Sequence, residues 1–121
     1  MEKERNSKRY DLEDRTLKFA MDVRTFVKIL PKSLAHSSDA LQLVRSSGSV
    51  GSNYIEANDS LSKKDFIMRI KICRKESKES RFWLNLFDLE CVQALEAQRQ
   101  RLIQESTELM NIFGAILKKT Q

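Results

Sequence analysis

Residues 62–87 read SKKDFIMRIKICRKESKESRFWLNLF, and apolar or small residues recur in this stretch at alternating steps of four and three. The recurring residues are Phe66, Ile70, Cys73, Ser77, Ser80, Leu84 and Phe87. Such heptad spacing predicts an α-helix with one buried seam, here with small residues at its centre. We expect this helix to run from about Lys63 to Glu90, with Ser62 and Asp65 forming a capping box at its start.

Three further helices are expected on either side of this stretch. The first begins at an Asp11 cap and ends before Pro31, the second runs from about Asp39 to Asn58, and the last from about Leu95 to Lys118. Their inward positions are Leu12, Phe19, Val23, Phe26 and Leu30, then Leu43, Ser47, Val50, Tyr54 and Ala57, then Leu102, Ser106, Leu109, Phe113 and Ile116. Short connections between four helices predict an all-α fold, an antiparallel up-down four-helix bundle over residues 11–121. Residues 1–10 are expected to be a polar N-terminal arm.

The second helix contains an unusual segment, SSGSVGSN at residues 46–53, which in isolation resembles a loop. We expect it to be helical because the apolar stripe continues through it in phase and no proline interrupts it. Two glycines cost roughly 1 kcal/mol each relative to alanine, so close packing against a neighbouring helix must compensate.

Composition excludes several classes of protein. Three glycines and one proline in 121 residues leave few tight turns for a many-stranded sandwich or barrel. No apolar run is long enough to cross a membrane, and the first residues lack the apolar core of a secretory signal. Cys73 and Cys91 do not form a disulfide framework and are expected to be small core residues. These features predict a cytoplasmic protein.

The helix at residues 63–90 has a basic face that carries no acidic residue. Its members are Lys63, Lys64, Lys71, Arg74, Lys75, Lys78 and Arg81. A net charge of +5 permits an anionic partner without requiring one. A run of like charges is usually only a solvated surface, and this is the favoured interpretation of the basic face. The alternative is a strip that binds phosphates, and it is supported by the absence of acidic residues from this face. The candidate nucleic-acid-binding residues are Lys64, Lys71, Arg74, Lys75, Lys78 and Arg81. Phe82 is the only aromatic residue near this face, so the sequence gives little support for base stacking on an open strand.

A second apolar group lies off the seam of the same helix. It consists of Met68, Ile72, Trp83 and Leu86, which either flank the core of one chain or form a contact between copies. The contact between copies is favoured, because the face of the second helix opposite its buried stripe carries mostly small, uncharged residues. Arg45 and Glu56 are the exceptions. Arg69, Glu56, Glu76 and Glu79 either form partly buried ion pairs at this interface or point to water.

The sequence offers no convincing catalytic or metal-binding constellation. The only histidine, His36, lies in a serine-rich connection without partners for a triad or a metal site. Gly48 and Gly51 do not complete a phosphate-binding or dinucleotide-binding loop. We therefore expect no catalytic residue, no cofactor, no metal, no small-molecule substrate and no membrane partner.

Three segments together carry a family resemblance, namely residues 46–57, 62–84 and 10–16. They resemble the bacterial four-helix-bundle proteins encoded in intervening sequences of 23S ribosomal RNA genes. The resemblance implies protomers assembled into a homopentameric ring, which fits the second apolar group. The family is also similar to the accessory variability protein of diversity-generating retroelements, a basic pentamer that binds nucleic acid and a reverse transcriptase. No catalytic residues are carried over, because the family has none established.

These observations favour a non-enzymatic oligomeric protein that binds structured RNA or the DNA backbone through the basic face. The alternative is a protein-interaction scaffold that docks an acidic partner such as a reverse transcriptase or an RNA-processing factor. An enzyme is the third and least favoured hypothesis.

Overall fold

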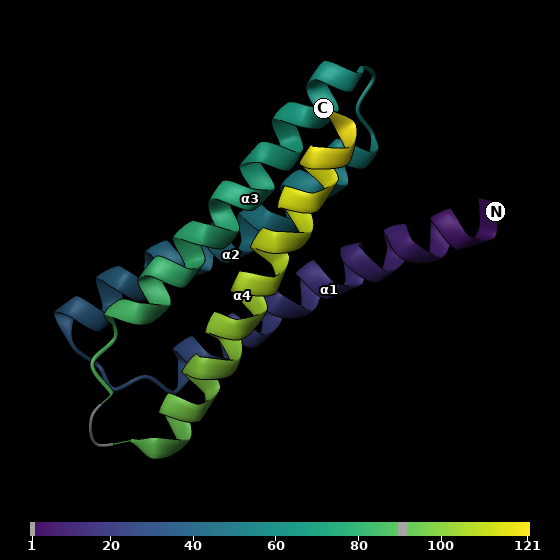
Figure 1. Ribbon diagram of the computed structural model, residues 1–121. Coiled ribbons are helices and arrows are strands. Elements are labelled where there is room, and N and C mark those ends of the chain that lie inside the picture. The colour runs from purple at the N-terminus through teal and green to yellow at the C-terminus, as the bar shows by residue number, and fades with distance from the viewer. Residues whose placement is uncertain (1, 90–91) are drawn as a thin grey trace.

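The computed structural model describes residues 2–89 and 92–121, which form four helices. These are α1 (Glu2–Lys28), α2 (Leu34–Asn58), α3 (Lys63–Leu86) and α4 (Gln93–Thr120). Successive helices run in opposite directions along the molecule (Figure 1), and no strand occurs in the described ranges. The predicted all-α four-helix bundle is confirmed. Within the same ranges, no helix has the length and apolarity needed to cross a bilayer.

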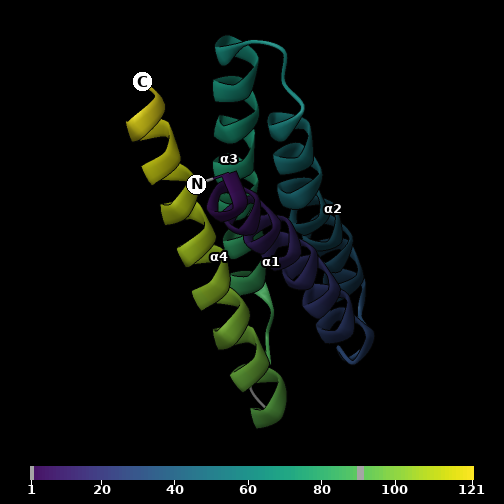
Figure 2. The ribbon, with the colours of Figure 1, turned by 90° about the vertical axis from the view of Figure 1, so that its right-hand side faces the viewer.

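Helix α3 packs against both α2 and α4, whereas α1 contacts α2 and, over a shorter length, α4. Figure 2 shows α2 and α4 on opposite sides of α3. Toward its N-terminus α1 diverges from the other three helices (Figure 1). Both flanks of α3 are therefore covered, one by α2 and the other by α4. Helix α4 borders two grooves, one shared with α1 and one shared with α3.

Small residues at the centre of the seam bring α2 and α3 close together. The hydroxyl oxygens of Ser46 and Ser80 lie 2.9 Å apart, and both side chains are fully buried. The Ser77 hydroxyl donates to the Cys73 carbonyl at 2.8 Å, and the Ser80 hydroxyl to the Glu76 carbonyl at 2.9 Å. These bonds satisfy buried polar groups that would otherwise destabilise the core. The helical interpretation of residues 46–53 is confirmed.

Cys73 occupies the same central layer, with its thiol donating to the Val50 carbonyl at 3.4 Å. Burial raises the pKa of the Cys73 thiol to about 12, because the apolar surroundings disfavour the thiolate. The thiol is therefore a packing group that stays protonated at neutral pH. The prediction for Cys91 lies outside the described residues.

Helix boundaries differ from the predictions at several ends. Helix α1 begins at Glu2 rather than at Asp11, because residues 2–10 contain no glycine or proline that would stop the helix. Helix α2 begins at Leu34, since the Ser33 hydroxyl accepts from the His36 amide and caps it. Helix α4 extends to Thr120. The division of the chain into an arm and a bundle domain stays a prediction. The predicted cap at Ser62, which accepts from the Asp65 amide, is confirmed.

Helix α3 ends at Leu86, before the predicted end at Glu90. Phe87 has extended backbone angles, and both Phe87 and Leu89 are buried. Because side chains alternate in extended backbone, this segment directs two apolar groups onto the end of the bundle. The Arg99 guanidinium from α4 donates to the Phe87 carbonyl and stabilises this departure from the helix.

The predicted core seam is largely confirmed, with three positions placed differently. Phe66 and Ile116 are half-buried, and Leu117 rather than Ile116 is the buried residue in the last turns of α4. Leu30 is also half-buried, and all three residues pack against the core.

Gly51 marks the closest approach of α1 to α2. A Cβ atom at this position would lie 3.0 Å from Thr16 Oγ1 and 3.2 Å from Thr16 Cβ. Thr16 itself is buried and donates to the Leu12 carbonyl at 2.9 Å, so it has little freedom to move. At Gly48 the same Cβ would meet only the end of the Arg24 side chain, at 3.7 Å.

We predict opposite effects of alanine at these two glycines. Gly48→Ala should stabilise the protein by about 0.5–1 kcal/mol, because alanine is the better helix former. Gly51→Ala should leave it about 1–3 kcal/mol less stable than Gly48→Ala, since the methyl group forces α1 and α2 apart. Urea unfolding at one protomer concentration measures both. Equal stabilisation by the two substitutions would contradict the close crossing at Gly51.

Candidate nucleic-acid interface

The basic face of α3 forms one wall of a groove between α3 and α4. The groove has a volume of about 720 Å³. Its lining residues are Lys71, Arg74, Lys75, Lys78 and Arg81 from α3, and Met110, Gly114, Leu117, Lys118 and Gln121 from the end of the chain. Five of the six candidate phosphate-binding residues are thus brought together. Lys64 is exposed near the start of α3 and does not line the groove.

Helix α4 supplies three features that the sequence did not reveal. Lys118, in the last turn of α4, adds a cation to the opposite wall of the groove. Gly114 leaves space for Arg74, whose Nε would be 3.8 Å from a Cβ at that glycine. Arg81 Nη1 donates to Thr107 Oγ1 of α4 at 3.3 Å. Arg81 is therefore bound to α4 and half-buried, and Arg74 lies beside Gly114, although it is exposed like Lys71, Lys75 and Lys78.

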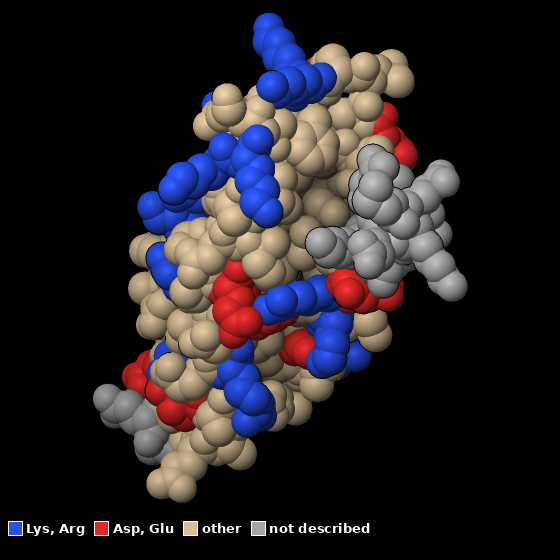
Figure 3. Space-filling view, turned by 45° about the vertical axis from the view of Figure 1, so that its right-hand side comes forward, with Lys and Arg blue, Asp and Glu red and all other residues tan. Residues whose placement is uncertain are grey.

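No acidic side chain from the described part of the chain lines this groove. Two acids of α4 lie instead on its α1 flank, where Arg15 donates to Glu105 at 2.7 and 2.8 Å and to Glu108 at 2.8 Å, and the third, Glu96, accepts from Arg99. Hydrogen bonds from Gln104 and Arg15 lower the pKa of Glu108. Figure 3 shows the same separation, with blue side chains along the upper left edge and alternating red and blue across the lower centre.

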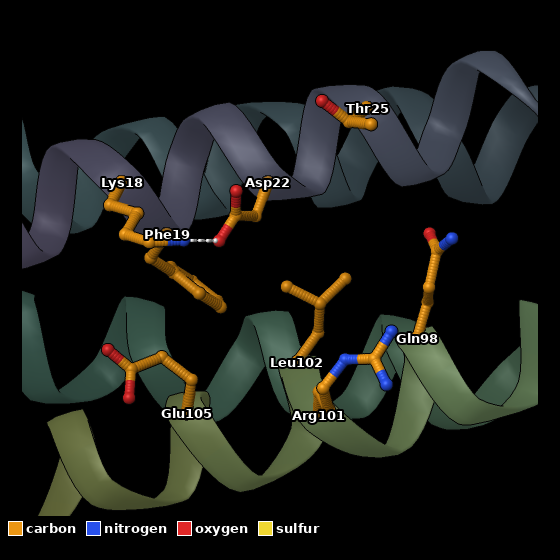
Figure 4. Close-up of a pocket in the computed structure, with 8 residues that line it drawn as sticks. All are labelled: Lys18, Phe19, Asp22, Thr25, Gln98, Arg101, Leu102 and Glu105. Carbon is orange, nitrogen blue, oxygen red and sulfur yellow. Dashed lines mark hydrogen bonds and ion pairs between the residues drawn. The ribbon is translucent and has the colours of Figure 1, made fainter.

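The groove between α1 and α4 has a different character. It has a volume of about 490 Å³, and Phe19 and Leu102 approach each other between the two helices (Figure 4). Charges of both signs surround them, including Lys18 with Asp22 and, on α4, Glu105. A polyanion gains little from such a surface, so the α3–α4 groove is the better candidate for phosphates.

The second apolar group lies on the other side of α3, toward α2. Met68 and Leu86 are 48% and 49% exposed, and Ile72 and Trp83 are half-buried. Two buried polar atoms nearby, Glu76 Oε2 and Trp83 Nε1, have no hydrogen-bond partner among the described residues. Buried groups of this kind are few in folded proteins, and each requires an explanation.

The ion pairs of this face are made by Arg45. Its guanidinium donates to Glu79, and its Nη1 lies 3.6 Å from Glu76 Oε2, too far for a hydrogen bond. Glu76 is only 6% exposed and Glu56 is exposed. Arg69 Nη1 instead donates to Asn53 Oδ1 at 2.9 Å. Of the four residues considered from the sequence, Glu76 and Glu79 therefore join an ion-pair cluster within the chain, and their cation is Arg45 rather than Arg69.

The described residues offer no sign of a metal centre, since no three histidine, cysteine, aspartate or glutamate side chains converge in them. The α3–α4 groove provides cations, a neutral amide and an apolar floor. Such a set can bind and neutralise phosphates, and no side-chain carboxylate, imidazole or thiol is among the described residues that line it.

Residues 8–115 match the sequence profile of the 23S rRNA-intervening sequence protein family. The chain belongs to this family. The resemblance noted in the sequence is thereby confirmed over nearly the whole chain. No protein with a curated description matches the sequence.

A solved structure of another protein has a similar fold. It is the crystal structure of a protein of unknown function from the S23 ribosomal protein family of Bacteroides thetaiotaomicron VPI-5482. The TM-score is 0.77 and the sequences are 28% identical, with 92% of this chain and 98% of that chain covered. This similarity supports the bundle and leaves the activity of the family open.

We predict that Arg45 and Glu76 are energetically coupled. Arg45→Met should destabilise the protein by about 1–3 kcal/mol, because it leaves a buried carboxylate without a cation. The same substitution in a Glu76→Gln background should cost less, since a neutral amide needs no counter-charge. Urea unfolding of the four variants in this cycle measures the coupling.

Lys18→Met is a matched control, because it breaks the exposed pair of Lys18 with Asp22 on α1. Exposed pairs at this spacing contribute only about 0.2–0.5 kcal/mol. Equal losses from Arg45→Met in both backgrounds would show that Glu76 does not depend on Arg45.

Proposed function

We propose that the protein is a non-enzymatic, oligomeric nucleic-acid-binding protein that holds phosphates of structured RNA or DNA in the α3–α4 groove. The observation that carries the proposal is the groove itself, in which Lys71, Arg74, Lys75, Lys78, Arg81 and Lys118 meet without an acid. A cytoplasmic location belongs to the same proposal, as does the absence of a small-molecule substrate and of a membrane partner.

The groove suits a nucleic-acid backbone for electrostatic reasons. Cations that neutralise phosphates release condensed counterions, and this release supplies most of the affinity at low salt. Lysines on flexible stems follow a backbone without demanding one geometry, whereas Arg81 is bound to Thr107 of α4 and presents its guanidinium beside that helix. Because phosphates carry no base identity, binding through this groove should discriminate poorly among sequences.

Assembly of copies through the face that carries Met68, Ile72, Trp83 and Leu86 is the second part of the proposal. A neighbouring chain would cover the exposed apolar side chains and could supply partners for Glu76 Oε2 and Trp83 Nε1. The family resemblance implies a ring of five. Because one groove per copy is then repeated around the ring, a long polyanion engages several grooves at once and gains avidity.

We predict that RNA binding depends on salt and on the groove lysines. The triple variant Lys71→Ala, Arg74→Ala, Lys78→Ala should have a shallower dependence of log affinity on log salt concentration. The magnitude of the negative slope should decrease by about 3, or one unit per cation removed. Titration of a labelled RNA hairpin at several salt concentrations measures this slope.

The control is the triple variant Lys28→Ala, Lys32→Ala, Lys119→Ala, which removes the same charge from residues that do not line the groove. It should keep most of the slope. Salt-insensitive affinity, or equal effects of the two triples, would contradict the proposal. Failure of the purified protein to bind RNA, together with a nuclease-resistant pull-down of an acidic protein, would instead favour a protein scaffold.

We predict that one glutamate on the apolar face separates the copies. Met68→Glu or Leu86→Glu places a charge where a neighbouring chain must exclude water, while both positions are half exposed in the isolated chain. Light scattering should show the molar mass falling from a multiple of 14.1 kDa to that of one chain.

Leu61→Glu is the control for a charge at an exposed apolar position, because Leu61 is 99% exposed in the connection before α3. It should leave the assembly intact. A wild-type protein that remains monomeric at high concentration would overturn this part of the proposal.

A further inference from the structure

Phe82 is a large aromatic side chain that neither the core nor the groove uses. It is 56% exposed, and it lies on α3 at the end of the row Lys71, Lys75, Lys78. We infer that Phe82 is a stacking platform for an unpaired base of the nucleic acid whose phosphates occupy the α3–α4 groove. The inference rests on the proposed function and adds to it the form of nucleic acid that the site recognises.

The position of Phe82 follows from helical periodicity. Lys71, Lys75, Lys78 and Phe82 are separated by steps of four, three and four residues, so they form one line along the outer side of α3. Successive members are about 5.4 Å apart along the helix axis. A backbone that follows the three lysines therefore reaches Phe82 at the next turn.

The Phe82 ring contacts Trp83 and remains more than half exposed. Its centroid lies 5.1 Å from that of Trp83 at an interplanar angle of 78°, an edge-to-face contact. Such a contact occupies at most one face of the phenylalanine ring. Glu79, three residues before Phe82 on α3, is bound to Arg45, so its charge is neutralised within the chain. A base can therefore stack on the other face of the ring without an unpaired Glu79 beside it.

Stacking on Phe82 requires an unpaired base. In a duplex both faces of each base are covered by neighbouring pairs, whereas loops, bulges and ends present base faces to aromatic side chains. The ligand class is therefore a single-stranded segment within a folded RNA or DNA, rather than a continuous duplex.

The experiment compares two RNA probes and three Phe82 variants. One probe is a hairpin with an adenine-rich loop, and the other is a blunt duplex with the sequence of the same stem. Phe82→Leu keeps an apolar side chain without an aromatic face, Phe82→Tyr keeps the face, and Leu61→Ala removes an exposed apolar group elsewhere. Fluorescence anisotropy at two salt concentrations gives each affinity, and light scattering checks that the assembly state is unchanged.

We expect Phe82→Leu to weaken hairpin binding about tenfold, since stacking on an aromatic side chain typically contributes that much or more per base. Duplex binding should change little, and Phe82→Tyr and Leu61→Ala should resemble the wild type. Because stacking involves no counterion release, the loss should be the same at both salt concentrations. Trp83 is the only tryptophan in the chain, and its emission should change on binding the hairpin but not the duplex.

The outcomes separate this inference from the proposed function. Equal effects of Phe82→Leu on the two probes, or no effect on either, overturn the stacking role while the groove triple variant still tests the phosphate site. A changed molar mass of Phe82→Leu assigns Phe82 to the contact between copies and also overturns it. If neither probe binds the wild-type protein, the proposed function itself fails.

Discussion

The close contact of α2 with α3 through serine hydroxyls determines how the rest of the molecule is arranged. Ser46 and Ser80 meet at 2.9 Å because neither side chain separates the helix backbones. The contact fixes the rotation of α3 about its axis, and with it the directions in which the basic and apolar groups point. One flank of α3 then faces α4 with arginines and lysines, while the other edge carries Glu76 and Trp83 beside α2. A larger side chain at either serine would separate the helices and rotate both surfaces.

Charge is divided between the two sides of α4 by the same geometry. Arg15 on α1 binds Glu105 and Glu108, so these two acids of α4 are neutralised on that side. The other side of α4 presents Gly114, Met110 and Leu117 to α3, and these residues add no charge to the groove. A net charge of +5 is modest for a protein that binds a polyanion. Segregation rather than total charge therefore gives the groove its positive potential.

Helical periodicity was sufficient to predict most of the core. Ile70, Cys73 and Leu84, for example, are spaced so that they lie on the same face of one helix, and that face is buried. It could not predict the partner of Glu76, since Arg45 meets it from another helix and such a pairing has no signature in spacing. Lys118 was missed as a groove residue for the same reason. The end of α3 was placed too late, because Phe87 continues the seam in phase even though its backbone is already extended. In each case a contact between distant segments decided the outcome.

Phe82 and Trp83 connect the two surfaces of α3, because adjacent residues on a helix point in directions about 100° apart. Phe82 continues the line of groove lysines, and Trp83 continues the apolar face on which copies are proposed to assemble. A neighbouring chain that covers Trp83 restricts the ring that supports Phe82, and a base stacked on Phe82 restricts Trp83 in return. Linkage requires such an effect to be reciprocal: if assembly strengthens strand binding, strand binding strengthens assembly by the same factor. The edge-to-face pair is therefore a direct physical route by which the proposed assembly and the proposed nucleic-acid site would affect each other.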